Sequence, residues 1–239
     1  MTLYELFVDA PNGRCGLLNV LAFVVALLAA LVLHELAHGL VALWNGDNTA
    51  KIYGRLTLNP IKHFDWVGLV LMFLVGFGWA KPVPVNPNNF KDKRIGAITV
   101  SIAGISTNII LAFFAAMFYV IFWNISPQTE SAAYAVYFFR ELSYLILSLN
   151  VAFALFNLLP LYPLDGYRLL SCFIDERNGA MMFLRRYSLY IMLGFIVFNS
   201  LSNYIPMLSL FSPLNWYLAR FGGLIQGGFY NFWRLIFNG

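Results

Sequence analysis

A run of ionisable residues at positions 34–38, His-Glu-Leu-Ala-His, directly follows residues 15–33, an apolar stretch without a single charge. A charged side chain at membrane depth costs roughly 2.5–3.5 kcal/mol on insertion scales, so such residues are kept mostly where they have a function. On a helix, His34 and His38 share one face and can bind the same metal ion. Glu35 can reach a water molecule at that ion without being a ligand. The run therefore predicts a metal site inside a bilayer.

The composition supports the membrane part of this prediction. Hydrophobic residues make up 60% of the 239 residues and charged residues only 11%, whereas charged residues are about a quarter of a typical soluble protein. We expect one membrane-embedded domain over residues 1–239, with a core at 16–170 and C-terminal helices at 186–237. The expected surroundings are a lipid bilayer, with no nucleic acid as a partner.

Four charge-free windows are long enough to cross a bilayer, which takes about 20 apolar residues. They are residues 15–33, 95–129, 142–164 and 187–219, the last with a turn signal near 203–206. The tail at 213–237 contains Arg220 and Arg234 among aromatic residues, and it can be a final span or a helix in the interface. The predicted fold is an all-α polytopic membrane protein with about five to six transmembrane helices.

Residues 66–80 form a shorter apolar segment with three glycines. Fifteen residues suit a re-entrant or interfacial segment better than a full span. If the segment returns to its starting side, residues 46–95 and 165–187 lie on one face and carry eleven of the fifteen Lys and Arg residues. The positive-inside rule then makes that face cytoplasmic. We therefore expect a multi-pass protein of the cell membrane with its metal site toward the cytoplasm.

The segment 50–58 follows the first helix and partly alternates polar and apolar residues. This alternation, together with several residues typical of strands, predicts a short membrane-associated β-hairpin.

A third metal ligand is needed, because a catalytic zinc usually has three protein ligands and one open position. His63 lies in a basic loop outside any expected helix. Asp165 is the better candidate, since it ends the third charge-free window after Pro160 and Pro163, and prolines break a helix. A broken helix at membrane depth is tolerated only where it lines a cavity or is buried in protein. By the expected topology, Asp165 lies on the same side of the membrane as His38.

These residues resemble the site-2 protease family of intramembrane zinc metalloproteases, the M50 peptidases. Two further stretches, 54–60 and 78–87, resemble a short bacterial-type branch without PDZ or CBS modules, and the similarity extends from about residue 30 to residue 170. The motifs that carry it are His34-Glu35-Leu36-Ala37-His38-Gly39, Ala103-Gly104 with Asn108, and Pro160, Pro163 and Leu164-Asp165-Gly166.

The resemblance implies an enzyme that hydrolyses peptide bonds within or near transmembrane segments of membrane proteins. It implies one Zn²⁺ per chain bound by His34, His38 and Asp165, with Glu35 as the base toward the water that zinc activates. Asn108 and Asn157 are candidates for hydrogen bonding to the substrate backbone or the developing oxyanion. Interhelical hydrogen bonds that hold the bundle together are an equally good explanation for both. A homo-oligomer is compatible with the sequence.

Two other functions remain open. Intramembrane His and Asp residues also mark the ion pathway of metal transporters, although no second ionisable cluster continues across this bilayer. A catalytically inactive relative could bind membrane proteins without cutting them, but such a protein has no need of Glu35.

Overall fold

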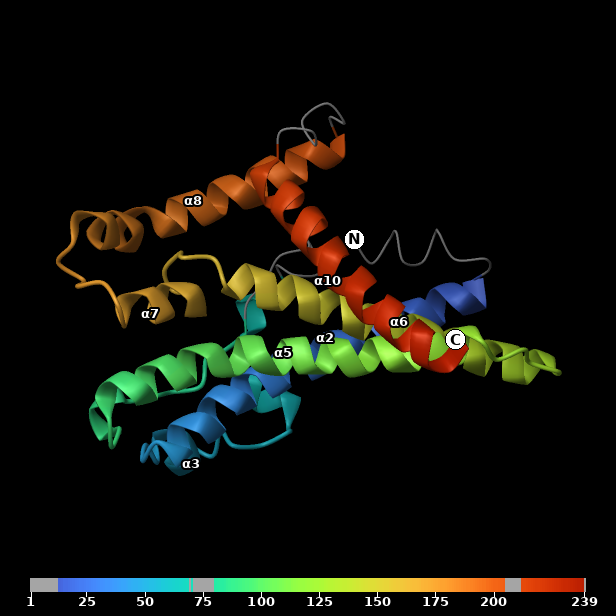
Figure 1. The fold of residues 1–239 in the computed structure, drawn as a ribbon, viewed down its shortest axis with the longest axis horizontal. Helices are drawn as coiled ribbons and strands as arrows, with labels where there is room; N and C mark the ends of the chain where they lie inside the picture. The colour runs from blue at the N-terminus through green and yellow to red at the C-terminus, as the bar shows by residue number, and fades with distance from the viewer. Residues whose placement is uncertain (1–12, 69, 71–79, 205–211, 239) are drawn as a thin grey trace.

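The computed structural model describes residues 13–68, 70, 80–204 and 212–238, and these are mostly helical (Figure 1). Three long helices make the most extensive contacts with one another: α2 (Gly13–Trp44), α5 (Lys93–Trp123) and α6 (Glu130–Asn157). The shorter α7 (Asp165–Ser171) packs against α5. The last two long helices are α8 (Gly179–Tyr204) and α10 (Pro213–Asn238).

Small residues fill the interfaces between the central helices. Ala22 and Ala26 of α2 pack with Leu145 of α6, and three alanines of α5 pack against α6 in a second cluster. In a bilayer, lipid tails are as apolar as leucine, so close backbone approach through small residues is what favours helix association. The three helices therefore approach closely enough for side chains of one to meet those of another.

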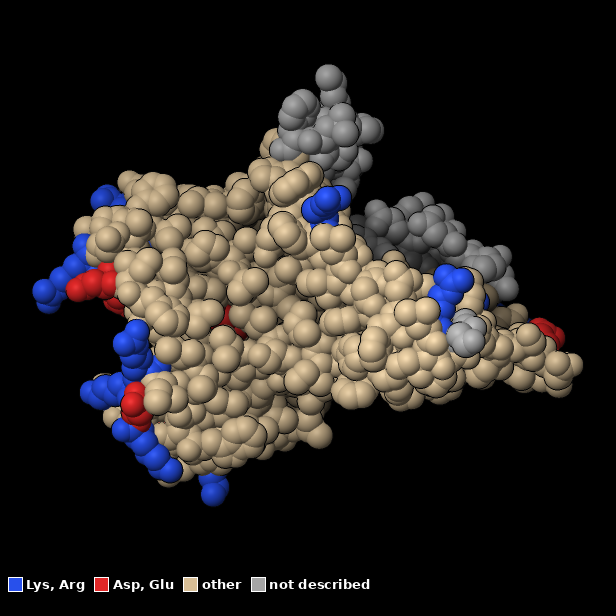
Figure 2. Space-filling model, viewed as in Figure 1, with Lys and Arg blue, Asp and Glu red and all other residues tan. Residues whose placement is uncertain are grey.

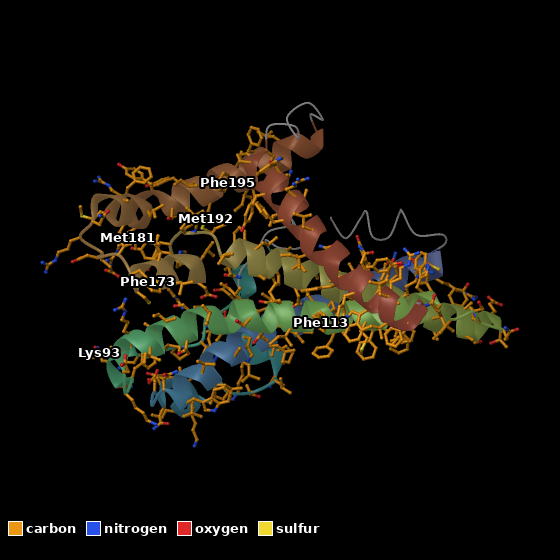
Figure 3. The ribbon with its side chains drawn as sticks, viewed as in Figure 1. Lys93, Phe113, Phe173, Met181, Met192 and Phe195 are labelled. Atoms are coloured by element: carbon orange, nitrogen blue, oxygen red, sulfur yellow. The ribbon has the colours of Figure 1, made fainter. Side chains whose placement is uncertain are left out.

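Helix α10 crosses over α5 and α6 (Figure 1). Its aromatic face meets Phe113 of α5, which lies at the crossing (Figure 3). The indole N–H of Trp233 donates a hydrogen bond of 2.9 Å to the backbone oxygen of Phe113. Tyr217, Leu218 and Ile225 of α10 cover the alanine cluster between α5 and α6. Helix α10 is thus part of the bundle.

Four helices of the described part are long and apolar enough to cross a membrane: α2, α5, α6 and Gly179–Phe198 within α8. The multi-pass helical prediction agrees with this result, but the expected count of five to six spans is not supported. Helix α10 was the ambiguous tail, and it is not among the four.

The predicted hairpin at 50–58 is wrong. Thr49–Ile52 is the helical turn α3, and the rest of the segment contains turns without a strand. Local hydrogen bonds prevail over the alternating pattern: Arg55 N–H donates to the oxygen of Ala50, and Gly54 N–H to that of Lys51. Gly54 has φ +62°, the left-handed conformation with which glycine typically ends a helix.

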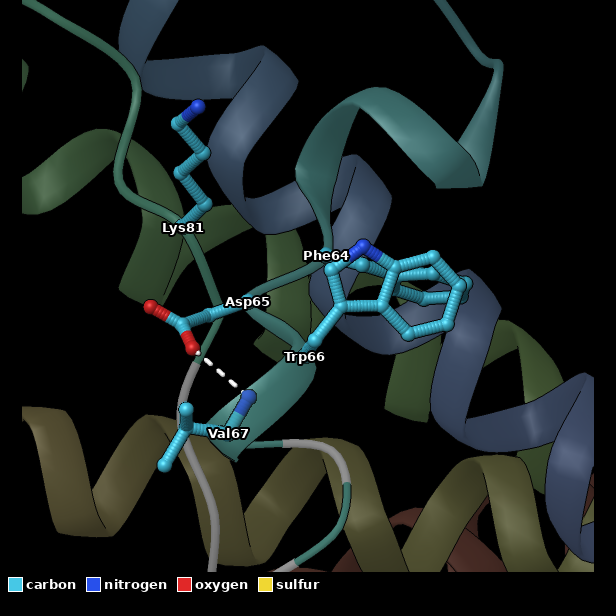
Figure 4. A pocket seen from close by; sticks show the side chains of 5 residues that line it. All are labelled: Phe64, Asp65, Trp66, Val67 and Lys81. Carbon is cyan, nitrogen blue, oxygen red and sulfur yellow. Dashed lines mark hydrogen bonds between the residues drawn. The ribbon is translucent and has the colours of Figure 1, made fainter.

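The predicted re-entrant segment 66–80 lies largely outside the described residues, but both of its ends are described. Phe64 and Ala80 form an antiparallel bridge, and Lys81 N–H donates to the oxygen of His63 at 2.9 Å. Beside this bridge, Asp65 accepts a hydrogen bond from Val67 N–H, and the side chains around it line an open pocket (Figure 4). The chain therefore comes back to the place from which it departs, as a re-entrant segment requires.

Lys and Arg side chains gather at one end of the molecule (Figure 2). This end is formed by α3, the start of α5, where Lys93 lies, and the connection between α7 and α8 (Figures 1 and 3). The charges of segments far apart in the sequence thus lie at the same end of the helices.

Candidate metal centre

His34, His38 and Asp165 come from two segments that are far apart in the sequence. Their side chains meet in one cluster, and all three are buried. The two Nε2 atoms lie 3.0 Å apart. Asp165 Oδ2 lies 3.3 Å from Nε2 of His34 and 3.1 Å from Nε2 of His38. Zinc binds nitrogen and oxygen at roughly 2.0–2.2 Å, so two ligands of one tetrahedral ion lie about 3.3 Å apart. The cluster therefore has the spacing that a single zinc ion needs.

Hydrogen bonds on the far side of each imidazole fix which nitrogen faces the cluster. Nδ1 of His38 lies 2.7 Å from the backbone oxygen of Val100, which can only accept, so Nδ1 of His38 carries the proton. Nδ1 of His34 lies 2.6 Å from Oδ1 of Asn108 and is a donor for the same reason. Both Nε2 atoms therefore present lone pairs to the cluster, as neutral histidine ligands do.

Asp165 supplies the third donor atom of the cluster, a carboxylate oxygen. The buried Oδ2 atom has no hydrogen-bond donor. An anionic oxygen and two imidazole lone pairs pointing at one another favour a cation between them, so the donor set fits a divalent metal.

The turn between α6 and α7 places Asp165. The chain leaves α6 at Asn157, turns through residues 158–164 and begins α7 at Asp165 itself. A Cβ atom at Gly166 would overlap the backbone oxygens of Leu158 and Leu159. Only glycine fits here, and the tight contact holds the first turn of α7 against the end of α6, from which Asp165 reaches α2.

Gly104 allows a similarly close contact with His34. A Cβ atom at Gly104 would overlap the imidazole of His34, so the ring lies directly against the backbone of α5. Gly104 and Asn108 are four residues apart and share a face of α5. One supports the ring of His34 and the other binds its Nδ1 atom.

Glu35 lies one residue beyond the first ligand and is half-buried. It is not part of the three-ligand cluster. Its Oε2 atom accepts a hydrogen bond of 2.8 Å from the backbone N–H of Val83. The carboxylate is thus held by the backbone of Val83 and is not part of the three-ligand cluster.

The other candidates from the sequence have different places. Asn108 is fully buried and bonded to protein on both sides, to His34 and to Asn150. Asn157 is half-buried, and its amide donates to the oxygen of Phe153 in the same helix. His63 is buried away from the cluster, with Nε2 donating to the oxygen of Thr57 at 2.8 Å. The structure therefore brings Asn108 to the metal centre and leaves His63 out.

Two features of the site are absent from the sequence analysis. Asn150 is fully buried and bonded to Asn108, and it lies two helical turns before Asn157 in α6. That interval of seven residues was a signal that both face the bundle interior. The hydrogen bond from Val83 to Glu35 uses a backbone N–H, so the residue type at position 83 gives no indication of it.

The fold and the cluster define a helical membrane protein with a buried His-His-Asp cluster that can hold a metal ion, next to a glutamate. Comparisons with known proteins give the family. Residues 127–201 match the family Peptidase_M50, described as Peptidase family M50.

Two relatives carry the name "Putative zinc metalloprotease". YwhC from Bacillus subtilis is 45% identical over 159 residues, which are 66% of this chain and 72% of the relative. Rip2 from Mycolicibacterium smegmatis is 27% identical over 220 residues, 88% of this chain and 80% of the relative. No solved structure matches significantly. This chain belongs to the M50 peptidase family.

Proposed function

We propose that this protein is a zinc metalloprotease that hydrolyses peptide bonds within or near the transmembrane segments of other membrane proteins. The observation that carries the proposal is the meeting of the ligand atoms of His34, His38 and Asp165 within 3.3 Å of one another, with Glu35 directly after His34 in the sequence. This combination supplies ligands for one metal ion and a separate base. The names of the two relatives support the same reaction.

Each residue has a chemical role in the proposal. His34, His38 and Asp165 would hold one zinc ion per chain, which when bound acidifies a water molecule and polarises the scissile carbonyl. Glu35 takes a proton from the attacking water and passes it to the leaving amine. Among the described residues, its carboxylate accepts a hydrogen bond through Oε2, from Val83 N–H, and Oε1 would take the proton.

The environment supports a membrane-embedded substrate. The ligands belong to α2, a candidate span, and to α7, which begins just after another span ends. The gathered Lys and Arg side chains suggest that this end of the bundle faces the cytoplasm (Figure 2). A helical substrate hides its peptide bonds in internal hydrogen bonds, so it must unwind locally. The amide of Asn157, at the end of α6, remains a candidate to bind the unwound backbone.

The test is cleavage of a reporter transmembrane peptide by the purified protein in detergent, combined with metal analysis. We expect about one zinc per chain, cleavage by the wild type and its loss on chelation. Glu35→Gln is expected to keep its zinc and lose cleavage. Turnover by folded, zinc-containing Glu35→Gln at the wild-type rate would remove Glu35 from its role. Zinc transport into vesicles without any cleavage would favour a transporter instead.

A further inference from the structure

Two fully buried asparagines connect helix α6 to the metal ligand His34. Asn108 Nδ2 donates to Asn150 Oδ1 at 2.6 Å, and Asn108 Oδ1 lies 2.6 Å from Nδ1 of His34. We propose that Asn150 and Asn108 are positioning residues that orient the His34 imidazole and fix its proton on Nδ1, so that Nε2 is a ready metal ligand. The proposal rests on the zinc site of the proposed function and adds two residues to it.

The chain of hydrogen bonds from Asn150 through Asn108 to His34, here called the relay, has a direction that is set by backbone oxygens. These atoms can only accept hydrogen bonds. Asn150 Nδ2 donates to the oxygen of Ile146 at 2.8 Å, so the amide of Asn150 must present its oxygen to Asn108. Asn108 must then present its NH₂ group to Asn150, and this group also reaches the oxygen of Ala30 at 3.4 Å. Only the amide oxygen of Asn108 is left for His34, and an amide oxygen accepts but does not donate. The proton therefore stays on Nδ1 of His34.

The surroundings leave His34 little choice of orientation. Gly104 supports the ring from the same face of α5. Asn108 and Asn150 are completely shielded from solvent, so their amide groups depend on hydrogen bonds to protein, and these are the ones within the described residues. His38 obtains the same proton placement from a single backbone oxygen, that of Val100. The orientation of His34 depends on side chains instead, so substitutions of these side chains can test it.

A purely structural role predicts a different outcome from the same contacts. If the asparagines only hold α5 and α6 together, their loss lowers thermal stability but leaves the zinc affinity of the folded protein unchanged. If they orient His34, zinc affinity falls in the folded protein. Residues that hold a metal-binding histidine from behind typically affect metal affinity by about 10–100-fold.

The experiment measures zinc dissociation constants by chelator competition and the visible absorption of the Co²⁺-substituted protein, on variants whose folding is checked by circular dichroism. Asn108→Leu is expected to weaken zinc binding about 10–100-fold and to change the Co²⁺ spectrum. Asn108→Asp keeps an acceptor for Nδ1 and is expected to bind zinc much more tightly than Asn108→Leu. Ser143→Ala is the matched control, since Ser143 is a buried polar residue of α6 that bonds to the oxygen of Phe139 in its own helix.

Asn150→Leu tests the direction of the relay. Asn150 acts only through Asn108, so the double variant with Asn108→Leu should bind zinc no more weakly than Asn108→Leu alone. Additive losses, or a zinc affinity of folded Asn108→Leu and Asn150→Leu within about twofold of wild type, would overturn the relay. If Asn108→Leu does not fold, Asn150→Leu and Asn108→Asp decide the question. Zinc binding without peptide cleavage in the wild type would defeat the proposed function and leave the relay intact.

Discussion

The backbone N–H of Val83 donates a hydrogen bond of 2.8 Å to Oε2 of Glu35. Pro82 and Pro84 flank Val83 and have no N–H group, so Val83 carries the only backbone donor of these three residues. The prolines also restrict the backbone, which disfavours a helix here. A short extended segment thus presents a single donor to the glutamate beside the metal centre.

This segment is held at both ends by buried side chains. Arg55 donates to the oxygen of Lys81 at 2.7 Å, and Asn86 N–H donates to Asp47 Oδ2 at 2.7 Å. Both Arg55 and Asp47 are buried, Asp47 completely. The segment between these two anchors therefore has little freedom to move away from Glu35.

Replacement of Val83 by proline removes the N–H and tests whether it orients Glu35. We expect Val83→Pro to keep its zinc, because no ligand is touched, and to lose about 10²-fold in kcat, the order of effect seen when a reacting group is misplaced by 1 Å. Val83→Thr has nearly the same shape and keeps the N–H, so it should retain most of the activity. Equal activity of the two variants would show that the hydrogen bond is dispensable.

Asp47 should make the anchor of this segment sensitive to acid. Burial raises the pKa of Asp47, but hydrogen bonds from Thr49, Asn86 and Asn89 outweigh burial and lower the pKa below its ordinary value of 3.8. A lowered carboxyl pKa means that the stabilisation is complete above about pH 3.8 and is lost as pH falls through the folded-state pKa. The anchor should be intact at neutral pH and open only in strong acid.

Hydrogen exchange of peptides covering residues 86–91, corrected for intrinsic rates, checks this behaviour. Wild-type protection should be constant from pH 7 to pH 5 and fall below about pH 3.8. Asp47→Asn should be less protected at pH 7 and lack the acid-dependent step. A wild-type step of the same size in Asp47→Asn would assign the acid sensitivity to another group.

The sequence predicted those parts of the site that depend on regular helix geometry. Residues four apart share a face of any helix, so the sequence already placed His34 and His38 together. Asp165 was placed by counting the spans and the sides of the membrane on which they end. The structure brings these three together. Each of the four charge-free windows overlaps one of the four apolar helices, the fourth only over residues 187–198. Helical spacing and hydrophobic length are local properties of the sequence, so they do not depend on tertiary contacts.

The parts that the sequence did not predict depend on contacts between distant residues. Residues 50–58 alternate like a strand, but hydrogen bonds such as that from Arg55 to Ala50 make them turn. For Asn108 the sequence left open both a substrate contact and an interhelical hydrogen bond, and the structure places its amide between His34 and Asn150. Residue type alone does not say which of several partners a buried amide chooses, because that choice depends on how the helices are packed.

Gly104 offers a test of the His34 position in which helix stability and metal binding change in opposite directions. Alanine in place of glycine inside a helix is favourable by about 0.5–1 kcal/mol in itself. At Gly104, however, the added Cβ would overlap the His34 ring, so Gly104→Ala should lose zinc affinity. Gly194→Ala is the control, because nothing lies within 4 Å of a Cβ built there. Unchanged zinc content in Gly104→Ala would mean that the ring can move without cost.

Zinc should stabilise the fold through Asp165, because one ion shared by all three ligands would tie α7 to α2. A ligand that binds the native state at 1,000 times its dissociation constant stabilises it by about 4 kcal/mol. Added zinc should therefore raise the thermal midpoint of metal-depleted wild type, measured by fluorescence in detergent. Asp165→Asn removes the anionic ligand and should lose most of this increase, while Asn157→Ala, whose amide bonds to Phe153 of its own helix, should keep it. An equal increase in wild type and Asp165→Asn would place the stabilising zinc at some other site.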